Sequence, residues 1–81
     1  MSLDEFKDFL NNSDKKVLVD FMAAWAPPCK VMNDRMKKLA EEYKEYCTVI
    51  RVDLDYSKEV HEAYGIIDLP TFKLFDKEYV I

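Results

Sequence analysis

The segment VLVDFMAAWAPPCK, residues 17–30, joins an apolar run to a proline-rich corner. Its first six residues are apolar apart from Asp20, which is typical of a strand covered on both faces in a mostly parallel sheet. Two prolines then precede Cys29. Pro28 suits the first turn of a helix, because the N–H that proline lacks would have no partner within the helix at that position. The segment therefore predicts a buried strand that turns directly into a helix, with one carboxylate inside the strand.

The helix after this corner is predicted over residues 28–46, because apolar side chains recur there every three or four positions. The stripe consists of Cys29, Met32, Met36, Leu39, Ala40, Tyr43 and Cys47. We interpret Met32, Met36 and Cys47 as core residues, because flexible thioethers and free thiols commonly fill apolar interiors.

The rest of the chain also alternates between helix and strand patterns. An opening helix begins at a capping box formed by Ser2 and Glu5 and ends before residues 11–14. The other predicted elements are a strand over 48–54, a helix over 57–64 capped by Ser57 and Gly65, and two hairpin strands over 71–75 and 78–81. This α-β-α-β-α-β-β order implies a mixed sheet with an antiparallel edge.

Length and charge narrow the function. The chain has 81 residues and is expected to form a single domain, residues 1–81. A net charge of −4 without a basic block disfavours nucleic acid and anionic membranes as partners. No signal sequence and no apolar run of membrane-spanning length is found, and there are two cysteines, so a reducing, cytoplasmic setting is expected. His61 stands alone, is expected on an exposed helix face, and gives no reason to expect a metal or other cofactor.

Two motifs resemble the thioredoxin family. The Asp-bearing strand followed by Trp25-Ala26-Pro27-Pro28-Cys29-Lys30 is similar to the family's strand and Trp-Cys-Gly-Pro-Cys-Lys or Trp-Cys-Pro-Pro-Cys corner. Leu69-Pro70-Thr71-Phe72 resembles the segment that carries the family's cis-proline. The resemblance covers nearly the whole chain and implies a minimal thioredoxin-like α/β fold. That fold would have about four strands in a mixed sheet with helices on both faces, and would lack the family's first strand and last helix.

The resemblance assigns a role to each residue of the corner. Ala26 stands at the position of the nucleophilic cysteine, at the exposed tip of the helix, and Cys29 at the position of the resolving cysteine. Asp20 matches the buried proton acceptor beneath the second cysteine, and Arg51 falls where relatives carry a lysine partner for that Asp. Because only a thiolate attacks a disulfide, Ala26 should block dithiol catalysis.

The same resemblance implies a groove for an extended peptide. Trp25, Pro27 and Pro28 would line it on the helix side, and Leu69 would pair with the peptide backbone beside a cis Leu69–Pro70 bond. A strand-edge proline is the alternative interpretation of Pro70. Pairing through the backbone needs no sulfur, so peptide binding could persist without catalysis.

Simpler interpretations stay open for two of these residues. Cys29 lies on the apolar stripe of its helix and is either an inert core thiol or a residual reactive one. Asp20 and Arg51 are either parts of a proton pathway or only a buried ion pair. In both interpretations burial should raise the pKa of Asp20, because desolvation disfavours its charged form.

Three functions follow from these alternatives. The first is a truncated or engineered thioredoxin whose parent exchanged thiols and disulfides with protein substrates and with a reductase. The second is a natural non-catalytic adaptor that binds peptides or proteins, as in a spliceosomal branch of the family. The third is a monothiol enzyme working through Cys29 with glutathione. A sheet face left bare by the absent last helix would also favour self-association.

Overall fold

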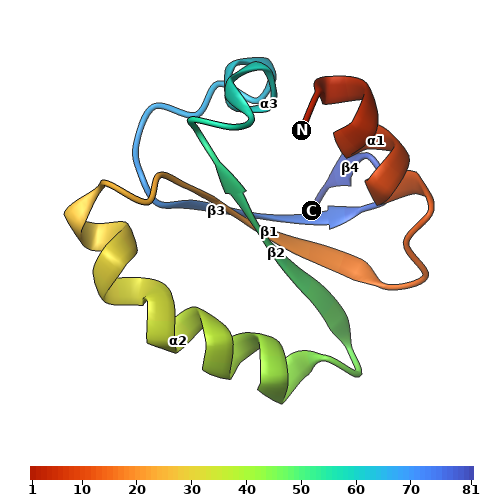
Figure 1. Ribbon diagram of the computed structural model, residues 1–81. Coiled ribbons are helices and arrows are strands. Elements are labelled where there is room, and N and C mark those ends of the chain that lie inside the picture. The colour runs from red at the N-terminus through yellow and green to blue at the C-terminus, as the bar shows by residue number, and fades with distance from the viewer.

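A four-stranded sheet divides the helices into two groups in the computed structural model, which describes residues 1–81 (Figure 1). Along the chain the elements are α1 (Leu3–Asn11), β1 (Lys16–Met22), α2 (Pro27–Tyr43), β2 (Cys47–Asp53), α3 (Lys58–Ala63), β3 (Thr71–Asp76) and β4 (Tyr79–Val80). Helix α2 lies on one side of the sheet, and α1 and α3 lie on the other side (Figure 1). The predicted α/β fold with helices on both faces is confirmed.

The strand order β2-β1-β3-β4 places β1 in the interior of the sheet. Strand β1 pairs in parallel with β2 and antiparallel with β3, so the predicted mixed sheet is confirmed. The register sets Asp20 opposite Arg51 on β2 and opposite Phe72 on β3. This central position explains why the side chains of β1 are mostly apolar on both faces of the sheet.

The larger core lies between the sheet and the helices α1 and α3. It consists of Phe6, Leu10, Val17, Val19, Phe21, Val52, Val60 and Phe75. Phe6 is fully buried, and its ring meets those of Tyr64 and Phe75 edge to face, with both pairs of ring centroids 5.6 Å apart. Edge-to-face packing adds stabilisation to the burial of apolar area, so α1 is held mainly by Phe6 and Leu10.

The predicted capping box at the start of α1 is confirmed. The backbone N–H of Glu5 donates to Ser2 Oγ at 3.1 Å, and the backbone N–H of Ser2 donates to Glu5 Oε1 at 2.9 Å. Two N–H groups that the first turn leaves unpaired are satisfied in this way. The bond from the Ser2 backbone also lowers the pKa of the Glu5 carboxyl, because it stabilises the charged form.

Helix α2 is shorter and less buried than its apolar stripe predicts. It begins one residue earlier, at Pro27, and ends at Tyr43, because the chain then turns with Tyr46 N–H donating to Tyr43 O at 2.9 Å. Only Cys29 and Met36 of the stripe are buried, while Tyr43 is 47% exposed. Neither α2, the longest helix, nor any other helix has the length and hydrophobicity that a membrane span requires.

Candidate functional site

The corner motif lies where β1 passes into α2. Ala26 is the N-cap residue of α2, in an extended conformation with φ −74° and ψ 124°. Its carbonyl accepts the first helical bonds, from the N–H of Cys29 at 3.0 Å and from the N–H of Lys30 at 3.1 Å. Alanine has no side-chain atom that could cap the helix, so this N-terminus has no side-chain acceptor for its N–H groups.

The expectation that Ala26 lies at an exposed tip is wrong. Ala26 is 5% exposed and Cys29 is fully buried, and both belong to a small core with Met22 and Ala23. The N–H of Ala26 donates to Ala23 O at 3.1 Å, and this turn folds the methyl group inward. Trp25 remains 57% exposed beside it. The methyl group at position 26 is therefore largely screened from solvent.

The loop before β3 meets this corner from the other side. Leu69 packs against the small core that contains Ala26 and Cys29. The Leu69–Pro70 peptide bond is cis, the isomer that the sequence predicts. Neither the backbone N–H nor the C=O of Leu69 has a hydrogen-bond partner within the chain. The structure thus brings the two motifs together and leaves the Leu69 backbone without a hydrogen-bond partner inside the chain.

Asp20 and Arg51 form the ion pair that the sequence suggests. Asp20 is fully buried, and its Oδ2 accepts a hydrogen bond from Arg51 Nε at 2.9 Å. Its Oδ1 is buried without any partner. Burial raises the pKa of the Asp20 carboxyl, and the guanidinium of Arg51 opposes that shift only in part.

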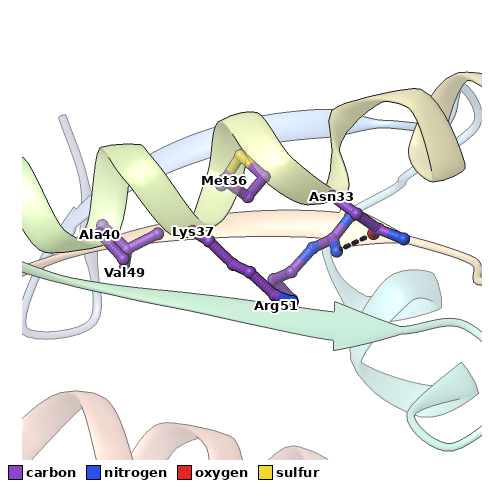
Figure 2. Close-up of a pocket in the computed structure, with 6 residues that line it drawn as sticks. All are labelled: Asn33, Met36, Lys37, Ala40, Val49 and Arg51. Carbon is purple, nitrogen blue, oxygen red and sulfur yellow. Dashed lines mark hydrogen bonds between the residues drawn. The ribbon is translucent and has the colours of Figure 1, made fainter.

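Arg51 also connects the sheet to the first turns of α2. One terminal nitrogen donates to Asn33 Oδ1 (Figure 2), and the other donates to Cys29 O at 3.4 Å. The guanidinium therefore bridges β1, β2 and the helix that carries Cys29. Sequence reasoning did not identify Asn33, because nothing in an exposed helical asparagine marks it as the partner of a residue on another strand.

The sequence prediction for His61 is also wrong. It is 2% exposed rather than on an exposed helix face. Its Nε2 lies 2.8 Å from Val52 O, its ring packs edge to face on Phe21 with centroids 5.3 Å apart, and its Nδ1 is buried without a partner. Helix α3 has only six residues, too few for a periodic signal that would show which face is inward. We assign His61 to the core.

The fold and the corner together define a thioredoxin-like domain. The family model for thioredoxin matches residues 1–81, and the chain therefore belongs to the thioredoxin family. Among solved structures, thioredoxin of Plasmodium falciparum superposes with a TM-score of 0.88 at 31% identity, over 99% of this chain and 76% of that chain. Mitochondrial thioredoxin 3 of Saccharomyces cerevisiae gives a TM-score of 0.87 at 30% identity, over 99% of this chain and 74% of that chain.

Curated relatives show the same family. Chloroplastic thioredoxin Y2 of Arabidopsis thaliana is 39% identical over 74 residues, which are 91% of this chain and 44% of that protein. Thioredoxin-1 of Drosophila melanogaster is 39% identical over 59 residues, 73% of this chain and 55% of that protein. The chain thus spans about half the length of these relatives.

Proposed function

We propose that this chain is a thioredoxin-type domain of redox function that recognises disulfide-bearing protein substrates at its corner but lacks the nucleophile for dithiol exchange. Membership of the thioredoxin family supports a redox function for this domain. The position of Ala26, at the N-cap of α2 and one helical turn from a buried Cys29, supports the loss of the reaction. This placement is the observation that carries the proposal.

The missing step follows from the chemistry of disulfide exchange. In a dithiol mechanism the first thiolate attacks one sulfur of the substrate disulfide, forms a mixed disulfide and expels a substrate thiolate. The second thiolate then attacks the first protein sulfur, expels the second substrate thiolate and leaves an intramolecular disulfide. Two electrons pass to the substrate, and an external dithiol returns them to the protein. Ala26 removes the sulfur needed for the first attack, and Cys29 alone cannot close the intramolecular bond.

Asp20 and Arg51 would serve the buried thiol rather than the substrate. In a chain that carried the missing cysteine, Asp20 would be the proton acceptor for Cys29, because its raised pKa lets it hold a proton nearer to neutral pH than an ordinary carboxyl. Arg51 positions both partners, because it bonds to Asp20 Oδ2 and to Cys29 O. With Ala26 in the motif the network has no reaction to serve, so here it acts as a buried ion pair.

Restoring the sulfur tests the proposal. We expect the chain to give no reduction of insulin disulfides with dithiothreitol above the uncatalysed rate, and Ala26→Cys to give strong reduction. Ala26→Ser is the matched control, because it adds a hydroxyl group at the same position that cannot form a mixed disulfide. Reduction by the unaltered chain through Cys29, or no gain from Ala26→Cys in a folded protein, would contradict the proposal.

A non-catalytic adaptor is the second candidate function. The unpaired backbone of Leu69 beside the exposed ring of Trp25 favours it, because an extended peptide can pair there without sulfur chemistry. Failure of Ala26→Cys to reduce insulin, together with peptide binding that Trp25→Ala weakens, would favour the adaptor. A monothiol enzyme is the weakest candidate, since Cys29 is fully buried.

The α2 side of the sheet supports a further part of the proposal, self-association. A cavity of about 290 Å³ with an entirely apolar lining lies there, and Phe72 nearby on β3 is 41% exposed. The lining residues are Leu18, Leu39, Tyr43, Cys47, Val49 and Leu74. Exposed apolar surface of this kind favours association, which sedimentation at increasing concentration would detect. We also propose one domain over residues 1–81 and a reducing, cytoplasmic location, in keeping with two free thiols.

A further inference from the structure

Each nitrogen of the Arg51 guanidinium donates a hydrogen bond to a different partner. Nε donates to Asp20 Oδ2 at 2.9 Å, and one terminal nitrogen donates to Cys29 O at 3.4 Å. The other terminal nitrogen donates to Asn33 Oδ1, and Figure 2 shows this bond between β2 and α2. The three nitrogens lie in one rigid plane. Fixing one of them therefore restricts where the other two can point.

The carboxyl of Asp20 depends on this plane, because Arg51 is its only hydrogen-bond partner. Oδ2 accepts the bond from Arg51, while Oδ1 is buried without a partner. Arg51 is also the only charged group that lowers the pKa of the Asp20 carboxyl, against the larger effect of burial. A displacement of the guanidinium therefore changes the balance between the charged and the neutral form of Asp20.

Few other titratable groups face Asp20. Its neighbours Val19 and Phe21 point into the core beneath α1 and α3, so Asp20 points to the α2 side of the sheet. On that side β3 places Phe72 opposite it, and the first turn of α2 contributes the buried Cys29 thiol. The charged residues of α2 nearest to position 33 are Lys30, Asp34 and Lys37. None of these three makes a hydrogen bond or an ion pair with Asp20 or with the guanidinium.

Asn33 is suited to holding the guanidinium in place. It lies four residues after Cys29 on α2, so the two acceptors on the helix are on the same face. Its amide oxygen accepts a hydrogen bond but carries no charge, so it does not compete with Asp20 for the positive charge of Arg51. The Arg51 side chain is 27% exposed, and a guanidinium released from Asn33 can therefore turn toward water.

We propose that Asn33 is a positioning residue, which holds the guanidinium of Arg51 in the orientation that bonds to Asp20 and to the Cys29 carbonyl. An exposed side chain on α2 thereby controls a buried acid–base group on β1. The proposal rests on the proposed function only for its catalytic consequence. Where a cysteine stands at position 26, Asp20 must be ionised to accept the proton of Cys29.

Carbon-13 NMR of the Asp20 carboxyl between pH 3.5 and pH 9 tests the proposal, with Asp20→Asn used to assign the signal. Asn33→Leu removes the acceptor and keeps a residue of high helix propensity. We expect its Asp20 titration midpoint to lie about half a pH unit higher. Moving two charges from about 4 Å to about 5 Å apart weakens their interaction by that amount at the effective dielectric of a protein surface. Asn33→Gln supplies an amide oxygen again and should return the midpoint most of the way.

The matched control is the same change of residue type at another exposed position. Asn12→Leu removes the bond from Asn12 Nδ2 to Asp8 O at 2.8 Å at the end of α1, which lies on the other side of the sheet from α2 (Figure 1). It should leave the Asp20 midpoint unchanged even where it lowers the stability of the fold. The proposal would be overturned by an Asn33→Leu midpoint that stays in place, falls, or moves no further than in Asn12→Leu.

The Ala26→Cys variant supplies a second measurement. In that background Asn33→Leu should lower kcat for insulin reduction about threefold on the acidic limb of the pH profile, because fewer molecules hold Asp20 ionised. KM should not change, because Trp25 and Leu69 are untouched. A raised KM with an unaltered pH profile would assign Asn33 to substrate binding and overturn the proposal. If Ala26→Cys fails to reduce insulin, the proposed function fails, and the Asp20 titration alone decides the role of Asn33.

Discussion

Asp20→Asn should stabilise the domain at neutral pH, although it removes one partner of a buried ion pair. Losing a hydrogen bond to a charged group ordinarily costs about 1.5–3 kcal/mol. Here the raised pKa shows which effect is larger, since the ionised carboxyl is less favourable in the fold than in water despite the bond to Arg51. Arg51 is not left isolated, because its side chain is 27% exposed and keeps its bonds to Asn33 and Cys29 O.

The stability gained by Asp20→Asn should increase as the pH rises. Below the unfolded pKa of Asp, about 3.8, both states hold the proton and the substitution should change little. As the pH rises from there to the raised pKa of the folded state, the unfolded chain releases its proton first, so the unaltered protein loses stability. Each unit by which the pKa is raised corresponds to about 1.4 kcal/mol, reached in full above the folded pKa.

Urea unfolding followed by far-ultraviolet circular dichroism between pH 3.5 and pH 8 measures this difference. With a slope of about 1 kcal/mol per molar urea for a chain of this size, one pKa unit moves the midpoint by about 1.4 M. Arg51→Gln is the matched control and should destabilise the fold at pH 8, because it leaves the carboxylate of Asp20 buried and unpaired. The reasoning would be refuted if the Asp20→Asn variant were no more stable than the unaltered protein at pH 8. It would also be refuted if the variant gained as much stability at pH 3.5 as at pH 8.

Three further substitutions, one of them a control, test the core and one turn by the same unfolding measurement. Phe6→Ala should lower the free energy of unfolding by about 3–5 kcal/mol, because it opens a cavity in the main core. The control Phe72→Ala, at a side chain that is 41% exposed on the other face of the sheet, should lower it by less than about 1 kcal/mol. Similar losses in the two variants would contradict the assigned core. Gly65→Ala should cost about 1–2 kcal/mol, because φ is +64° while no atom lies within 4 Å of the added methyl, so that only backbone strain contributes. A loss near zero there would show that the turn relaxes.

Local patterns were enough for the element order and for much of the corner. The apolar run 17–22 lies between two strands and is buried except for the half-buried Leu18, and a pattern apolar at nearly every position predicts a strand covered on both faces. The capping box of Ser2 and Glu5 is confirmed because its residues are three positions apart and need no distant partner. The position of Ala26 at the start of α2 also follows from the prolines that succeed it.

Contacts between distant segments could not be read in this way. The burial of Ala26 depends on Leu69, the bridge from Arg51 to Asn33 depends on how α2 lies over β2, and the burial of His61 depends on Phe21. In each case one residue lies against a segment 18 to 43 positions away, and a sequence pattern reports only the faces of a single element. Residue order therefore determines which reactive groups the chain carries, among them the Cys29 thiol and the Asp20 carboxyl, whereas packing alone decides which of those groups meet.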